Sequence, residues 1–182
     1  MPDPVVRKIP ASKTSLASRA FPRADFADTY AIRLEAHGAG LLDLYARAMF
    51  EDPPAWVSDM MRLRDRLVAI FGIKTSAELR AGKGRPNRMK GTSSDIGGRI
   101  GAFTILARTE NEILLGGNDR HLDFRVSILR GDTGDVSDIS VTTVVKLNNL
   151  LGRFYLLPVK PAHRVIVPAM MRRAARSIFR TR

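Results

Sequence analysis

The chain has 182 residues, of which 45% are apolar and 26% are charged, and its formal net charge is +12 at pH 7. A chain of this length fits one domain and can bury a sizeable core. The absence of cysteine excludes disulfides, cysteine-based metal sites and a cysteine nucleophile. No stretch is long and apolar enough to predict a membrane-spanning helix, and residues 1–23 lack the apolar region of a secretory signal. We therefore expect a cytoplasmic location.

The positive charge gathers in two segments. The last acidic residue is Asp138, and nine lysines and arginines follow it in residues 139–182. Residues 74–99 hold seven more lysines and arginines against two acidic residues. Such fields attract polyanions, although a basic surface can also simply keep a protein dissolved. The sequence leaves both interpretations open.

The first half of the chain predicts one strand and two helices. Residues 1–24 read as an extended segment, and residues 25–34 alternate as a half-buried strand does. Residues 41–51 carry apolar side chains at helical spacing. A second helix follows Asp52, a good N-cap, and runs from about Pro53 to Phe71.

A long basic segment separates this half from the rest of the sheet. Residues 74–101 are rich in glycine, serine and basic side chains, and they predict a mobile loop with a short helical turn at 76–81. Four strands then follow in close succession, with tight turns between them, so they should pair antiparallel. Their predicted ranges are 102–108, 112–115, 121–129 and 139–147.

The C-terminal segment, residues 149–179, predicts helix interrupted by proline. Pro158, Pro161 and Pro168 should divide or kink it, with the firmly helical part beginning near Pro161. From there Val165 and Ala169 step down one face at helical spacing. The fold class is therefore α+β: a curved antiparallel sheet, two helices after the first strand and a long C-terminal helix packed on the sheet.

This order of elements resembles the helix-grip fold of START-like proteins, the Bet v 1 or SRPBCC class. The resemblance implies one domain over residues 25–182, with an apolar cavity between the sheet and the last helix. Several motifs also resemble a bacterial family catalogued as domain of unknown function 2867, for which no activity is known. The motifs lie at 24–30, 56–74, 116–127 (GGNDRHLDFRVS), 151–156 and 159–167. The aromatic residue usual in that family after Pro161 is Ala162 here.

The densest polar feature is a stripe on the third of the four late strands. His121, Asp123 and Arg125 alternate with Leu122 and other apolar residues, so they should share one face of the sheet. Facing a cavity, the stripe can bind an acid or move a proton. Facing solvent, it forms cross-strand ion pairs, and this interpretation is favoured because the apolar partners already define a core face.

The histidines do not predict a metal site. The three are far apart in the sequence and no cysteine accompanies them, so we expect neither a metal nor a cofactor. His37 reads as a surface residue of a glycine-rich turn. His163, close to the expected start of the last helix, is assigned a structural role.

Three functions remain open. The first is a domain that binds a small apolar molecule between the sheet and the last helix, as a monomer or a homodimer. The second is an enzyme that acts on a small acidic substrate through His121, Asp123 and Arg125. The third is a binder of anionic membranes or nucleic acid through residues 146–182. For the first, the expected pocket wall is Phe103, Ile105, Phe124, Val126, Val141, Tyr155, Val165 and Ala169.

Overall fold

Helices cover both faces of a curved antiparallel sheet. The computed structural model describes residues 4–34, 40–69, 96–133 and 136–180. Its elements, in chain order, are β1 (Val6–Lys8), α1 (Leu16–Ala20), β2 (Phe26–Leu34), α2 (Leu41–Glu51), α3 (Ala55–Ala69), β3 (Arg99–Ile100), β4 (Phe103–Arg108), β5 (Glu112–Asn118), β6 (Leu122–Thr133), β7 (Val136–Leu147) and α5 (Leu150–Arg180).

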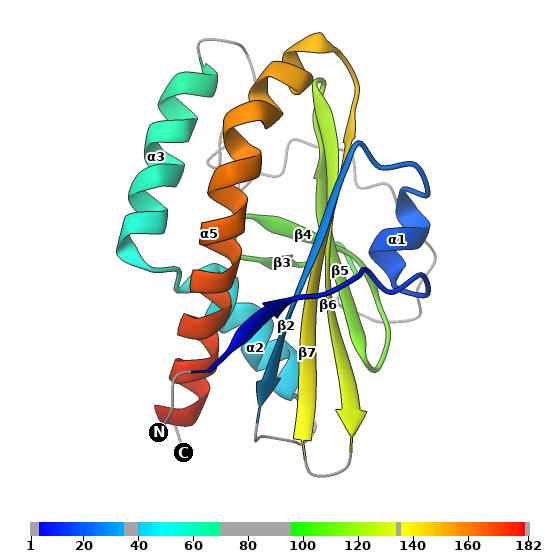
Figure 1. Ribbon diagram of the computed structural model, residues 1–182, viewed down its shortest axis with the longest axis vertical. Coiled ribbons are helices and arrows are strands. Elements are labelled where there is room, and N and C mark those ends of the chain that lie inside the picture. Colours follow the sequence, from blue (N-terminus) through cyan, green and yellow to red (C-terminus); the bar gives the residue numbers. More distant parts are fainter. Residues whose placement is uncertain (1–3, 35–39, 70–95, 134–135, 181–182) are drawn as a thin grey trace.

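Within the described ranges, seven strands form one sheet in the order β1-β2-β7-β6-β5-β4-β3. The long hairpin β6–β7 lies at its centre, and every neighbouring pair is antiparallel. Helix α5 runs along one face beside α2, while α1 lies against the opposite face (Figure 1). The expected fold class is therefore confirmed. None of the helices in the described part of the chain is long and apolar enough to cross a membrane.

The main core lies between the sheet and the helices α2 and α5. Alternate residues of the strands supply one side of it, such as Ile32, Ile113 and Ile128, all almost fully buried. A smaller core lies on the opposite face, where Ala17 of α1 packs with Leu114 of β5. Because both faces are covered, neither face of the central strands is a free exterior surface.

The N-terminal segment is more ordered than the sequence predicts. Residues 6–8 pair with β2 as an edge strand, in the register Val6↔Ile32. Helix α1 begins at the N-cap Ser15, whose side-chain oxygen accepts a hydrogen bond from the Ser18 amide at 3.2 Å. Its apolar side chains find a partner surface on the sheet, and this long-range contact has no signature in the local sequence.

Helix α5 is one continuous helix and not the divided one that its prolines predict. It runs from Leu150 to Arg180 with Pro158, Pro161 and Pro168 inside. Pro158 and Pro161 lie on the exposed side, where water can satisfy the carbonyls that lose their backbone donors. The other side buries a stripe at helical spacing, which stabilises the helix through packing. The buried residues of that stripe are Leu156, Val167, Met171, Ala174 and Ile178.

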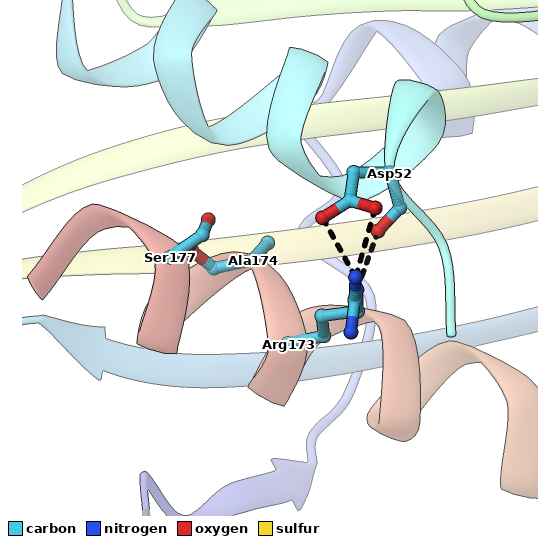
Figure 2. A network of polar contacts seen from close by, with 4 residues as sticks. All are labelled: Asp52, Arg173, Ala174 and Ser177. Atoms are coloured by element: carbon cyan, nitrogen blue, oxygen red, sulfur yellow. Dashed lines mark hydrogen bonds and ion pairs between the residues drawn. The ribbon is translucent and has the colours of Figure 1, made fainter. Parts of the chain in front are cut away.

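The contact between α2 and α5 fixes the lower half of α5 on the sheet. The Tyr45 hydroxyl donates a hydrogen bond to the Met171 carbonyl at 3.2 Å in the buried interface. At the rim, the Arg173 guanidinium binds both carboxylate oxygens of Asp52 at 2.8 and 2.9 Å, and its Nε donates to the Asp52 carbonyl (Figure 2). Arg173 therefore joins the C-terminal end of α2 to α5.

The predicted ranges agree with the strands and helices in outline, but several boundaries differ. Strand β6 extends to Thr133 and β7 begins at Val136, beyond the predicted 121–129 and 139–147. Helix α3 begins at Ala55, so Asp52 is the C-cap of α2 and not the N-cap of α3.

Strand β5 continues through Gly116 and Gly117, where the sequence predicts a turn, because Gly116 pairs with Arg125. A Cβ atom at Gly116 would lie 2.6 Å from the Phe124 carbonyl, so this glycine permits close strand pairing. Of the predicted loop at 74–101, residues 74–95 and the turn at 76–81 lie outside the described residues.

Candidate functional site

The sheet residues of the expected pocket wall share the face that α5 covers. Ile105, Val126 and Val141 belong to the main core, and the half-buried Phe103 and Phe124 pack against it. The rings of Phe103 and Phe124 meet edge to face, with centroids 5.4 Å apart. Val126 of β6 pairs with Thr143 of β7, and Val141 of β7 pairs with Ile128 of β6, so the two valines are diagonal neighbours on one face. The structure thus groups these five side chains on one surface.

The expected wall residues of α5 are placed less uniformly. Tyr155 and Ala169 are half-buried, whereas Val165 is 61% exposed and lies outside the layer between helix and sheet. The cause is the position of each residue around the helix. The buried stripe of α5 passes through Leu156 and Val167, and Val165 lies on the other side. Continued at the same spacing, that stripe also contains Lys160 and His163, which therefore face the sheet side.

A buried carboxylate from the sheet meets His163 in this layer. Asp28 of β2 has the same parity as Tyr30 and Ile32, so its side chain belongs to the face beneath α5. The Nδ1 atom of His163 lies 2.9 Å from the Asp28 Oδ2 atom. The Asp28 side chain is 3% exposed and the His163 side chain is 19% exposed. An ionisable pair therefore joins β2 to α5 inside a mostly apolar layer.

The geometry of the pair fixes which atoms remain available. With Asp28 as a carboxylate, which only accepts hydrogen bonds, Nδ1 of His163 is the donor of the bond between them. In the neutral imidazole, Nε2 is then an acceptor. The second carboxylate oxygen, Asp28 Oδ1, is buried and accepts no hydrogen bond from any group in the described residues. The pair thus presents one buried acceptor that the described protein groups leave unused, Asp28 Oδ1, and a second acceptor at Nε2 of the neutral His163 ring.

Aromatic and basic side chains surround the pair. The Phe26 ring packs edge-on against the His163 ring, with centroids 5.6 Å apart, and the Lys160 ammonium lies 5.9 Å from the Phe26 centroid. Burial raises the pKa of the Tyr30 phenol, and the neighbouring Asp28 carboxylate adds to this, while Arg164 opposes it. A phenol that stays protonated keeps the surroundings of Asp28 free of a second negative charge.

The polar stripe of His121, Asp123 and Arg125 does not form a common site. His121 precedes β6, and its Nδ1 atom lies within hydrogen-bonding distance of the Asn149 amide, at the start of α5. Arg125 is buried on the opposite face of the sheet, where its guanidinium lies 4.8 Å from the Phe21 centroid. Asp123 is half-buried on that same face. The expected exterior position is therefore wrong for Arg125, because the N-terminal segment covers it.

The buried guanidinium of Arg125 forms hydrogen bonds to residues of β5 and β6. Its Nη1 atom donates to the carbonyls of Gly117 and Phe124 and to Asn118 Oδ1, at 2.7–3.2 Å. Burial lowers the pKa of this guanidinium, and the nearby Asp123 carboxylate partly offsets the effect. These contacts lie within β5 and β6, so Arg125 stabilises the end of the β5–β6 hairpin and the cover formed by Phe21.

A buried glutamate holds α1 against the same face. Glu112 accepts the Leu16 amide at 2.7 Å and also accepts the Ser127 hydroxyl. Leu16 is the first residue of α1, where a backbone N–H lacks a partner within the helix. Glu112 therefore attaches the N-terminal segment to β5 and, through Ser127, to β6. Both of its hydrogen bonds hold the fold together.

Sequence reasoning missed the Asp28–His163 pair although part of its signal was present. Asp28 interrupts a series of same-parity apolar residues, Phe26, Tyr30 and Ile32, and a charged residue in such a series marks a buried polar position. His163 lies near the expected start of the last helix and next to Arg164, a position for which the sequence indicates only a structural role. Only the packing of α5 reveals that these two residues meet.

Comparison with known proteins identifies a family but no characterised relative. Neither a curated protein nor a solved structure matches the chain. The profile of the family described as "Protein of unknown function (DUF2867)" matches residues 20–170. The matched range contains strands β2 to β7, both members of the Asp28–His163 pair and most of α5. The chain therefore belongs to the DUF2867 family of proteins of unknown function.

Proposed function

We propose that this protein binds a small molecule between the sheet and α5, with an O–H or N–H group of the molecule on the Asp28–His163 pair. The observation that carries the proposal is the buried Asp28 Oδ1 atom, which has no hydrogen-bond partner within the described ranges. A buried polar atom without a hydrogen bond costs about 1–3 kcal/mol. A ligand that donates to this oxygen recovers that free energy, which gives the site both affinity and a preference for donors.

The surroundings define the rest of the ligand. The face beneath α5 is built from aliphatic and aromatic side chains, and Phe124 and Val126 of β6 lie two strands away from Asp28 in the register of the sheet. Such a lining suits a largely apolar molecule with one polar end. His163 keeps 19% of its side chain exposed, so the pair is connected to solvent.

Acid–base catalysis is the second candidate function. A carboxylate that orients an imidazole through Nδ1 leaves Nε2 able to take a proton from a bound molecule. Acid–base catalysis fits Asp28 and His163, which contact each other, better than His121, Asp123 and Arg125. The hydrogen bonds of His121 and Arg125 go to different parts of the protein. Ligand binding is the simpler proposal, because it needs only the two acceptors that the pair presents.

Fluorescence titration with N-phenyl-1-naphthylamine tests the binding proposal. This neutral, apolar probe carries one N–H donor and brightens when it leaves water, and its N-methyl derivative lacks the donor. We expect saturable binding of the first probe and binding at least about tenfold weaker for the second, since one hydrogen bond to a charged group contributes roughly 1.5–3 kcal/mol.

Paired substitutions supply the matched control. The double variant D28L/H163L removes both acceptors without leaving an unpaired buried charge, so it should remove the preference for the N–H probe. R47L/E51L removes an exposed ion pair of α2, with an N···O distance of 3.0 Å, and should leave the preference intact. Equal binding of both probes by the wild-type protein would contradict the proposed role of the pair.

A further inference from the structure

The outward side of α5 carries an exposed apolar stripe. Leu150, Phe154, Leu157 and Val165 are 67%, 68%, 65% and 61% exposed. They follow one another at spacings of four, three and eight residues, with the exposed Pro161 between the last two, so they lie along one side of the helix. This stripe is opposite the side that holds Leu156 and His163 on the sheet, and core packing does not account for it.

Basic residues accompany the stripe. Arg153 and Arg164 are exposed and lie beside its apolar residues along the same half of α5. No acidic residue occurs after Asp138, so α5 itself carries no negative charge to neutralise them. The surface is therefore a combination of large apolar side chains and arginines on an exposed helix face.

We propose that this face docks on an anionic lipid surface, with α5 lying in the plane of the interface. A helix with an apolar stripe and flanking arginines binds such a surface by inserting the apolar residues while the arginines contact the lipid phosphates. The whole chain, at +12, is attracted to the same surface over a longer range. Phe154 is the deepest anchor, because its large ring is the most exposed of the four apolar side chains.

A second copy of this chain and nucleic acid are the two alternatives to a lipid surface. The combination of positive charge and apolar side chains on this face argues against both. A symmetric dimer through the stripe would place the Arg153 and Arg164 side chains of one copy next to those of the other, which is unfavourable without acidic partners. Nucleic acid would use the arginines but would leave the leucines and the phenylalanine in water, since phosphate contacts dominate that kind of binding. Anionic lipid satisfies both components.

Vesicle co-sedimentation of the full chain tests this inference. We expect binding to phosphatidylcholine vesicles that contain phosphatidylserine, and binding weaker by at least about tenfold to phosphatidylcholine alone. F154E/L157E should abolish binding, whereas V5E/L44E, which adds the same two charges at exposed apolar residues outside α5, should retain most of it. R153Q/R164Q should weaken binding more than R19Q/R23Q, a matched pair of exposed arginines in the N-terminal segment on the opposite face.

Three outcomes would overturn the inference. The first is vesicle binding that F154E/L157E leaves unchanged, with folding verified by thermal unfolding of each variant. The second is wild-type protein that stays in solution with phosphatidylserine vesicles but binds duplex DNA. The third is sedimentation equilibrium that shows a dimer which F154E/L157E dissociates. Probe binding at Asp28 and His163 is a separate measurement, so neither result decides the other.

Discussion

Among the described residues, the Asp28 carboxylate is held by His163, with the Tyr30 phenol beside it. Its Oδ2 atom bonds to His163, and its Oδ1 atom is buried without a partner. An ion in this position is tolerated only while its neighbour stays in place, because removal of one member leaves the other desolvated and unpaired. The stability of the fold is therefore sensitive to the two residues as a unit and not to each separately.

The variant H163L should lower the free energy of unfolding by about 1–3 kcal/mol, because it removes the imidazole hydrogen bond from a buried carboxylate. The double variant D28L/H163L should regain most of that loss, since no charge then remains in the layer. Urea denaturation of the wild type, both single variants and the double variant measures the coupling. A double variant that loses the sum of both single effects would show that the pair does not act as a unit.

At the residue scale, the sequence predicts the apolar part of the site better than its polar part. Alternation along β6 correctly assigns Phe124 and Val126 to one face, because a strand has a period of two. Asp28 and His163 are 135 positions apart, and no local pattern predicts their contact. Arg125 was misassigned for the same reason, because Phe21 covers it from a distant segment.

Helix α5 shows how tertiary packing overrides a local signal. Three prolines predict breaks, yet the helix is continuous because one side of it is buried against the sheet and α2. The prolines shift no residue of the buried stripe, whose spacing stays helical from Leu156 to Ile178. The boundaries of α2, by contrast, are those that the sequence predicts, since Gly40 before it, Asp52 and Pro53 after it and its apolar period all indicate the same range.

The contact between α2 and α5 predicts that two nearby residues of α5 differ greatly in their contribution to the free energy of unfolding. M171A should lower the free energy of unfolding by about 2–5 kcal/mol, because Met171 is fully buried and its removal leaves a cavity. R173A should lower it by only about 0.2–1 kcal/mol, although Arg173 binds Asp52 through both carboxylate oxygens, because the pair is largely exposed. Thermal or urea unfolding distinguishes the two, and equal losses would contradict the assignment of the core.

At the scale of the whole molecule, α5 has two differently equipped sides. Its inner side carries His163 toward Asp28, and its outer side carries Phe154 and Leu157 into solvent. The element order and the α+β class follow from the sequence because period, caps and turns are local properties. The closing of both sheet faces, by α1 on one side and α5 on the other, depends on contacts between distant segments and emerges only in the folded chain.

Native mass spectrometry of the purified full chain tests the central claim most directly, because it detects an occupant without assuming its identity. The account predicts a population of wild-type protein that carries the added mass of one small molecule. D28L/H163L should lose this population, and R47L/E51L should retain it. Wild-type protein found only at the mass of its polypeptide, together with no saturable binding of N-phenyl-1-naphthylamine, would contradict the proposal that Asp28 and His163 hold a ligand between the sheet and α5.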